Sequence, residues 1–93
     1  MRLRKDPRAK DYIENSDLVV SNPEKYKGQW NQYFNNDNEI HVEFGMGKGG
    51  FMIQLAKANP HINYLGVERF ETVVYKACKK AEREQAPSNL KYI

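Results

Sequence analysis

The stretch "HVEFGMGKGG", residues 41–50, places four glycines directly after a short run that alternates polar and apolar side chains. The run, which begins at residue 39, predicts a β-strand. Glycines at its end let the backbone turn tightly into a helix and approach a ligand closely. One pattern in the stretch is G-x-G-x-x-G, typical of dinucleotide sites, and another is E-x-G-x-G-x-G, typical of the nucleoside site of a methyl donor. The second pattern uses Glu43, Gly45, Gly47 and Gly49.

Strands and helices alternate from residue 39 onward. Apolar and β-branched runs predict strands over residues 39–44, 63–68 and 90–93, and helical periodicity predicts helices over 50–59 and 69–84. This β-α-β-α-β order predicts an α/β fold with a doubly wound parallel sheet. The side chains expected to face the core are Phe51, Leu55 and Ala58 in the first helix and Phe70, Val73, Val74, Ala77 and Ala81 in the second.

Upstream of the sheet, residues 22–34 predict one helix. Asn22 is a suitable N-cap and Pro23 fits the first helical position, whereas Gly28 weakens the prediction. The aromatic residues of this segment recur on one helical face, which favours packing against a core over stacking on bases. They are Tyr26, Trp30, Tyr33 and Phe34, and "NNDN" at 35–38 ends the segment.

Three strands make about half of the usual doubly wound sheet, so the sequence predicts the N-terminal part of a larger protein. We expect two regions: a basic arm with a helical extension over 1–38, and the incomplete first half of a cofactor-binding domain over 39–93. The first strand would lie at the centre of a complete sheet. One of its edges is therefore expected to be uncovered.

Positive charge is concentrated at the start of the chain. The formal net charge is +3, but residues 1–10 alone carry +4. A basic arm on a near-neutral body indicates contact with phosphates, most commonly those of nucleic acid, although a solvated terminus that binds nothing has the same composition. The candidate contacts are Arg2, Arg4, Lys5, Arg8 and Lys10.

Two carboxylates accompany the glycines. Glu43 lies at the carboxyl end of the first strand, where it would repel a pyrophosphate and attract the ammonium and sulfonium of S-adenosylmethionine. Glu68 ends the second strand, where an acidic side chain accepts hydrogen bonds from ribose hydroxyls in either kind of cofactor. Glu43 therefore favours the methyl donor, while Glu68 indicates an adenosine nucleoside in general.

The remaining chemically active side chains predict little. His41 and His61 lack cysteine or acidic partners at ligand spacing, so no metal site is expected. His41 is interpreted as an ordinary strand residue and Cys78 as a small, inert thiol in the second helix. One cysteine and no long apolar segment favour a cytoplasmic protein that does not span a membrane.

The stretch "EFGMGKGGFMIQLAKANPHINYLGVE" (43–68), preceded by "PEKYKGQWNQYF" (23–34) and an arginine-rich start, resembles the bacterial tRNA (guanine-N7)-methyltransferase family. The resemblance implies a Rossmann-like enzyme that transfers a methyl group from S-adenosylmethionine to a guanine of tRNA. It assigns cofactor binding to Glu43, Gly45, Gly47, Gly49 and Glu68. The family's catalytic aspartate follows the fourth strand, so no catalytic residue can be named in this chain, which is expected to be inactive alone.

Two other interpretations remain open. The formal G-x-G-x-x-G match allows an NAD-binding dehydrogenase fragment, which Glu43 disfavours. The basic arm and the aromatic segment allow a non-catalytic RNA-binding module, which leaves the glycine loop unexplained. Binding of a nucleoside cofactor distinguishes the module from the two enzymes, and the identity of that cofactor distinguishes the enzymes from each other.

Overall fold

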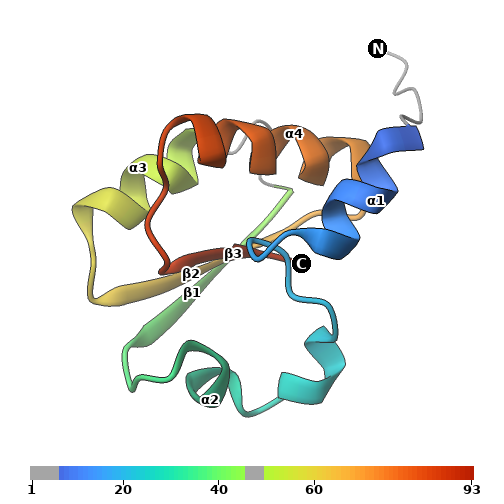
Figure 1. The fold of residues 1–93 in the computed structure, drawn as a ribbon. Helices are drawn as coiled ribbons and strands as arrows, with labels where there is room; N and C mark the ends of the chain where they lie inside the picture. Colours follow the sequence, from blue (N-terminus) through green and yellow to red (C-terminus); the bar gives the residue numbers. More distant parts are fainter. Residues whose placement is uncertain (1–6, 46–49) are drawn as a thin grey trace.

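A computed structural model describes residues 7–45 and 50–93 and contains a parallel sheet between two unequal layers of helices (Figure 1). α3 and α4 cover one face of the sheet with α1 beside α4, and the short helices η1 and α2 lie on the other side (Figure 1). In chain order the elements are α1 (Pro7–Asn15), the 3-10 helix η1 (Pro23–Tyr26), α2 (Trp30–Phe34), β1 (Glu39–Phe44), α3 (Gly50–Ala58), β2 (Ile62–Val67), α4 (Glu71–Arg83) and β3 (Leu90–Tyr92).

The sheet has the order β1-β2-β3, and both neighbouring pairs are parallel. Each strand is joined to the next by a helix, as a parallel arrangement requires. The predicted α/β class and incomplete Rossmann-like sheet are therefore confirmed. Among the described residues β1 pairs only with β2, which also confirms the uncovered edge expected for the first strand.

The core lies between the sheet and the α3–α4 layer. Tyr64 of β2 and Leu90 and Tyr92 of β3 are buried against these two helices. Burial of these apolar side chains is what holds the two layers together. The helices contribute Met52, Ile53, Ala56, Val74, Ala77, Cys78 and Ala81.

The buried face of α3 differs from the prediction. Phe51 is 71% exposed and Ala58 is also exposed, whereas Met52, Ile53 and Ala56 are buried and Leu55 is partly buried. The helix is mostly apolar, so several faces satisfy the periodicity, and its contacts with β2 and α4 select among them.

α4 follows the prediction more closely. Val74, Ala77 and Ala81 are buried as expected, but the helix begins at Glu71 rather than at residue 69. Phe70 is its N-cap, with extended backbone and a side chain that is 44% exposed, so its predicted place in the buried face was wrong. A residue before the first helical turn does not follow the helical periodicity.

The single helix predicted over 22–34 is divided in two. η1 ends at Tyr26 and α2 begins at Trp30, and between them Gly28 has a φ of 75°. A left-handed residue ends a right-handed helix, and glycine adopts that conformation without strain. The four aromatic rings still contact one another, with Tyr26 and Tyr33 centred 4.8 Å apart, and all four side chains are only partly buried.

The N-terminal region contains structure that the sequence interpretation missed. α1 packs against α4, where the rings of Tyr12 and Tyr75 meet edge to face at 5.1 Å. After α1 the chain runs along the outer side of β3: Tyr92 N donates to Leu18 O at 2.7 Å, and Val20 N donates to Tyr92 O at 2.9 Å. This segment, residues 18–20, covers the edge of β3 that faces away from β2.

Candidate cofactor-binding site

Glu43 lies near the carboxyl end of β1, on the face of the sheet covered by α3 and α4. His41, two residues earlier, pairs with Tyr64, and their rings are centred 5.5 Å apart on that face. Glu43 pairs with Gly66, which has no side chain, and the carboxylate is exposed to solvent. A ligand above this end of the sheet therefore has direct access to Glu43.

Gly45 begins the turn after β1. Its φ is 62°, a conformation that costs most other residues about 1–2 kcal/mol. Its amide donates to Val67 O at 3.0 Å, which holds the start of the turn against β2. Apart from its chain neighbours, no heavy atom of residues 7–45 and 50–93 lies within 4 Å of the position that a Cβ would occupy. Gly47 and Gly49 lie outside the described residues.

Glu68 follows β2 directly and is partly buried. Its amide donates to Ile93 O at 3.1 Å, which ties it to the end of β3. One carboxylate oxygen, Oε1, accepts a hydrogen bond from the amide of Arg69 at 3.0 Å. The bond orients the side chain at the carboxyl edge of the sheet.

Glu43, Gly45 and Glu68 meet at one place because the carboxyl ends of parallel strands lie along the same edge of a sheet. The carboxylates supply acceptors for an ammonium or for ribose hydroxyls, and the described residues leave the position above Gly45 unfilled. The same negative charge opposes a pyrophosphate. These residues therefore fit the nucleoside and amino-acid parts of S-adenosylmethionine better than they fit NAD.

The predicted nucleic-acid contacts are only partly described. Arg2, Arg4 and Lys5 lie outside the described residues. Arg8 and Lys10 are exposed, but they belong to α1 rather than to an extended arm. α1 also approaches a basic residue that was not among the predicted contacts, because Lys79 Nζ of α4 lies 5.5 Å from the centre of the Tyr12 ring.

α1 itself has a signal in the sequence, although no helix was predicted there. Ala9, Tyr12 and Ile13 recur at the i, i+3, i+4 spacing of one helical face.

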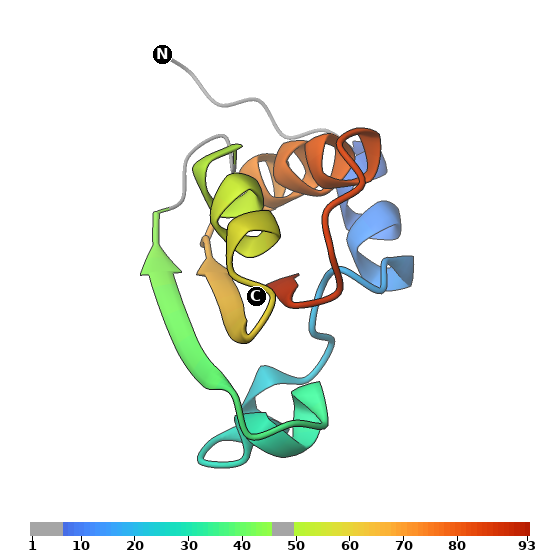
Figure 2. The same cartoon turned by 90° about the vertical axis from the view of Figure 1, so that its left-hand side faces the viewer.

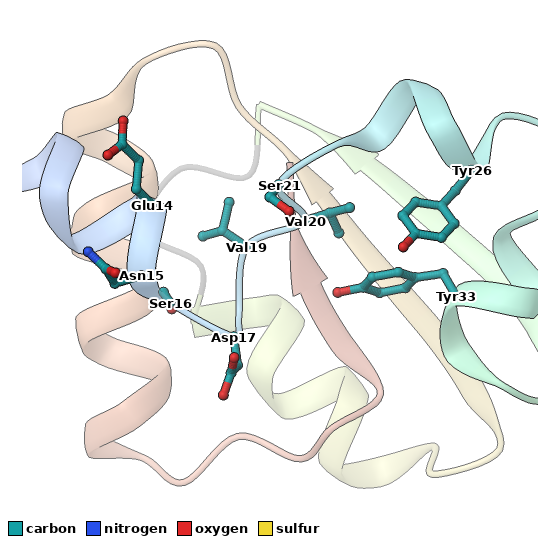
Figure 3. A pocket seen from close by; sticks show the side chains of 9 residues that line it. All are labelled: Glu14, Asn15, Ser16, Asp17, Val19, Val20, Ser21, Tyr26 and Tyr33. Atoms are coloured by element: carbon teal, nitrogen blue, oxygen red, sulfur yellow. The ribbon is translucent and has the colours of Figure 1, made fainter.

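A pocket of about 260 Å³ lies at a different place, between the segment after α1 and the two short helices (Figure 3). The hydroxyls of Tyr26 and Tyr33 point toward it from one side (Figure 3). Burial raises the pKa of Tyr33, with smaller contributions from Tyr26 and Asp17. None of the predicted site residues that the structure describes lines this pocket, whose walls are formed by Glu14, Asn15, Ser16, Asp17, Val19, Val20, Ser21, Tyr26 and Tyr33.

His41 and Cys78 lie in ordinary structural environments, and His61 is exposed. His41 contacts Glu39 through Nε2 at 3.2 Å, as expected for a strand residue with a neighbouring partner. Cys78 is fully buried, and burial raises the pKa of its thiol to about 12, so it is protonated and unreactive at neutral pH.

Within residues 7–45 and 50–93, no group of three potential metal ligands occurs. The helices of this same part of the chain are all too short or too polar to cross a membrane.

Comparison with known proteins gives a family match. The family model described as "Putative methyltransferase" matches residues 37–93, from just before β1 to the end of β3. The matched region contains Glu43, the glycine loop and Glu68.

Curated relatives extend the similarity into the N-terminal region. A tRNA (guanine-N(7)-)-methyltransferase of Bacillus subtilis (strain 168) is 49% identical over 87 residues, which make up 92% of this chain and 41% of the relative. A protein of the same name from Lachnoclostridium phytofermentans is 46% identical over 93 residues, which make up 100% of this chain and 43% of the relative. The chain thus spans less than half the length of these relatives.

Proposed function

The chain belongs to this methyltransferase family, and from that premise we propose that residues 39–93 bind S-adenosylmethionine as the cofactor-binding part of a tRNA (guanine-N7)-methyltransferase. The observation that carries the proposal is that Glu43 and Gly45, at the end of β1, lie beside Glu68, at the end of β2, along the carboxyl edge of the sheet. The names of the relatives support the choice of tRNA and of the guanine N7 atom.

In the proposed site each residue has a separate task. Glu43 accepts hydrogen bonds from a cationic group of the cofactor, and Glu68 accepts them from the ribose hydroxyls. Gly45, Gly47 and Gly49 let the backbone approach the cofactor closely. When bound, S-adenosylmethionine supplies a methyl group activated by its sulfonium.

The acceptor requires little from the protein beyond alignment. Guanine N7 already carries an available lone pair, so its methylation needs little help from a general base. Catalysis would depend on holding the N7 atom in line with the methyl group and on the charge surrounding the sulfonium. No residue of this chain is proposed to be catalytic, and we expect the chain to be inactive alone. A tRNA substrate also favours a cytoplasmic location.

We expect Glu43→Gln to weaken binding of S-adenosylhomocysteine about 10- to 100-fold, because hydrogen bonds to a charged group contribute about 1.5–3 kcal/mol. Isothermal titration calorimetry of the folded chain measures this directly. Glu39→Gln is the matched control, since it removes an equal charge from the same face of the same strand at the opposite end. Its affinity should stay within about twofold of the unchanged chain.

NAD serves as the competing ligand in the same titration. Binding of NAD but not of S-adenosylhomocysteine would favour the dehydrogenase interpretation. A folded chain that binds tRNA and neither cofactor would favour the RNA-binding module. Equal losses for Glu39→Gln and Glu43→Gln would show that net charge, rather than a contact at Glu43, determines affinity.

We further propose that the basic residues at the start of the chain contact tRNA phosphates. Replacing Arg2, Arg4 and Lys5 by glutamine should weaken the salt dependence of tRNA binding. The slope of the logarithm of affinity against the logarithm of salt concentration should become less steep by about 2–3, since each lost phosphate contact removes about 0.7–0.9 from the slope. Fluorescence anisotropy with labelled tRNA at several salt concentrations gives this slope.

A matched variant neutralises three lysines elsewhere, Lys25, Lys27 and Lys57, all of which are exposed. It changes net charge by the same amount, so it should lower affinity less and leave most of the salt dependence intact. If the two triple variants behave alike, the start of the chain makes no specific contact with tRNA.

A further inference from the structure

β3 is a strand of three residues that is held on both of its sides. It pairs with β2 on one side, and the segment 18–20 runs along the other side (Figure 2). Tyr92 makes its backbone hydrogen bonds to this segment: its amide donates to Leu18 O, and its carbonyl accepts from Val20 N. A strand this short makes few hydrogen bonds, so those to the segment 18–20 are a large part of what fixes its position.

The residue after Tyr92 bonds in the opposite direction. Ile93 N donates to Gly66 O at 2.9 Å, and Ile93 O accepts from Glu68 N at 3.1 Å. Consecutive residues of a strand direct their backbone groups to opposite sides, so one peptide unit separates the atoms that the segment 18–20 holds from the carbonyl that holds Glu68. A displacement of Tyr92 is therefore passed on to the backbone of Glu68.

The bond to Ile93 matters for Glu68 because of what the other bond of this residue does. Arg69 N donates to Glu68 Oε1 at 3.0 Å, which joins Glu68 only to its neighbour in sequence. That bond sets the direction of the carboxylate but moves with the backbone, whereas the bond to Ile93 ties Glu68 to the end of β3. Hydrogen bonds to a ligand require the binding group to be held within about 0.5 Å of its place.

We propose that the segment 18–20 is a positioning element of the cofactor site, and that the amide of Val20 holds Glu68 in place for the ribose by way of β3. The inference rests on the proposed function, in which Glu68 accepts hydrogen bonds from the ribose hydroxyls. The segment lies outside residues 37–93, which the family model matches. The N-terminal region is thereby assigned a part in cofactor recognition that is separate from its proposed contacts with tRNA.

The first test compares S-adenosylhomocysteine with an analogue that lacks both ribose hydroxyls, by isothermal titration calorimetry. The unchanged chain should bind the analogue about 10- to 100-fold more weakly, because hydrogen bonds to a carboxylate are lost. Val20→Pro removes the amide that donates to Tyr92 O, and the ratio of the two affinities should fall below about threefold. A general loss of stability would instead weaken both ligands by the same factor and leave the ratio unchanged.

Val19→Pro is the matched control for this change. The amide of Val19 donates to Ser16 O at 3.3 Å rather than to β3. Proline is tolerated at the border of a sheet where the N–H faces away from the neighbouring strand. The ratio of affinities should therefore stay within about twofold of that of the unchanged chain. Far-UV circular dichroism verifies that both proline variants remain folded.

The second test needs no ligand and leaves the backbone intact, so it also decides the matter if Val20→Pro does not fold. Lys91 Nζ donates to Asp17 O at 2.9 Å, and Lys91→Met removes this bond between β3 and the residue that precedes Leu18. Hydrogen exchange followed by NMR should become at least about twofold faster at the Glu68 amide, relative to the exchange of core amides in α3. Lys76→Met, at an exposed position of α4, should leave this relative rate unchanged.

Two results would overturn the inference and leave the proposed function standing. One is a folded Val20→Pro chain whose ratio of affinities falls no further than that of Val19→Pro. The other is a Lys91→Met chain in which the relative exchange rate at Glu68 does not rise. An unchanged chain that binds both ligands equally well would contradict the role of Glu68 itself, and the inference would then fail together with the proposed function.

Discussion

Replacing Asn89 by aspartate is expected to lower the free energy of unfolding by about 3 kcal/mol. Asn89 precedes β3 and is 9% exposed. Its Nδ2 amide donates to the carbonyl oxygens of Ala56, Asn59 and Ile62 at 3.1, 3.1 and 2.8 Å. One side chain thus joins the end of α3, the following turn and the start of β2.

The three carbonyl groups explain the size of the effect. The last carbonyls of a helix have no partner within the helix and need one from outside. Aspartate fits the same space but donates nothing, so these oxygens would face a buried negative charge. Urea unfolding at neutral pH measures the loss, and thermal unfolding should show a decrease in Tm of roughly 10–20 °C.

Asn59→Asp provides the matched control. Asn59 Nδ2 donates to one carbonyl, that of Leu55 at 3.0 Å, and the side chain is only partly buried. The chemical change is identical, but fewer acceptors are affected and water can replace the lost donor. We expect a loss of about 1 kcal/mol. If Asn89→Asp costs no more than this control, the three carbonyl groups find other partners without the Asn89 amide.

Alkaline pH is expected to destabilise the fold strongly. Burial raises the pKa of Cys78 from its ordinary value near 9.0 to about 12 and also raises the pKa of Tyr92, with smaller contributions from nearby acidic groups. Both groups are fully buried and neutral in the folded chain. The unfolded chain loses these protons at lower pH than the folded chain. The contribution of these two groups to the free energy of unfolding is therefore fully present below about pH 9. It is lost as pH rises toward the pKa values that the groups have in the folded chain.

For each such group, the free energy of unfolding is expected to fall by about 1.4 kcal/mol per pH unit. Urea unfolding at intervals between pH 8 and pH 11 measures it. Cys78→Ala and Tyr92→Phe should each flatten the alkaline decline. Val74→Ala, in the same core, should lower stability by a similar amount at every pH and leave the slope unchanged. A folded chain whose stability is constant from pH 9 to pH 11 would show that thiol and phenol ionise without opening the core.

Local patterns predicted the elements of the sheet because each strand and helix carries its own periodicity. The β-α-β-α-β order required only the lengths of apolar runs and the turn residues between them. The face that α3 buries depends on tertiary contacts, since Phe51 and Met52 are both apolar and only packing against α4 and β2 distinguishes them. The pairing of residues 18–20 with β3 joins segments about 70 residues apart, and no local pattern predicts such contacts.

The positions of the candidate site residues in the fold were more predictable than the packing. Glu43, Gly45 and Glu68 were identified from residue type and from position at strand ends, and topology alone brings those ends to one edge. The roles of these residues remain predictions. Asn89 illustrates what sequence cannot provide: an asparagine after a proline and a serine is typical of a turn, while its three carbonyl partners come from residues distant in sequence.

The segment 18–20 determines where this sheet can be extended. It occupies the side of β3 that faces away from β2, where Tyr92 exchanges hydrogen bonds with Leu18 and Val20. The backbone groups on that side already have partners, so further strands can join the sheet of the described residues only beside β1.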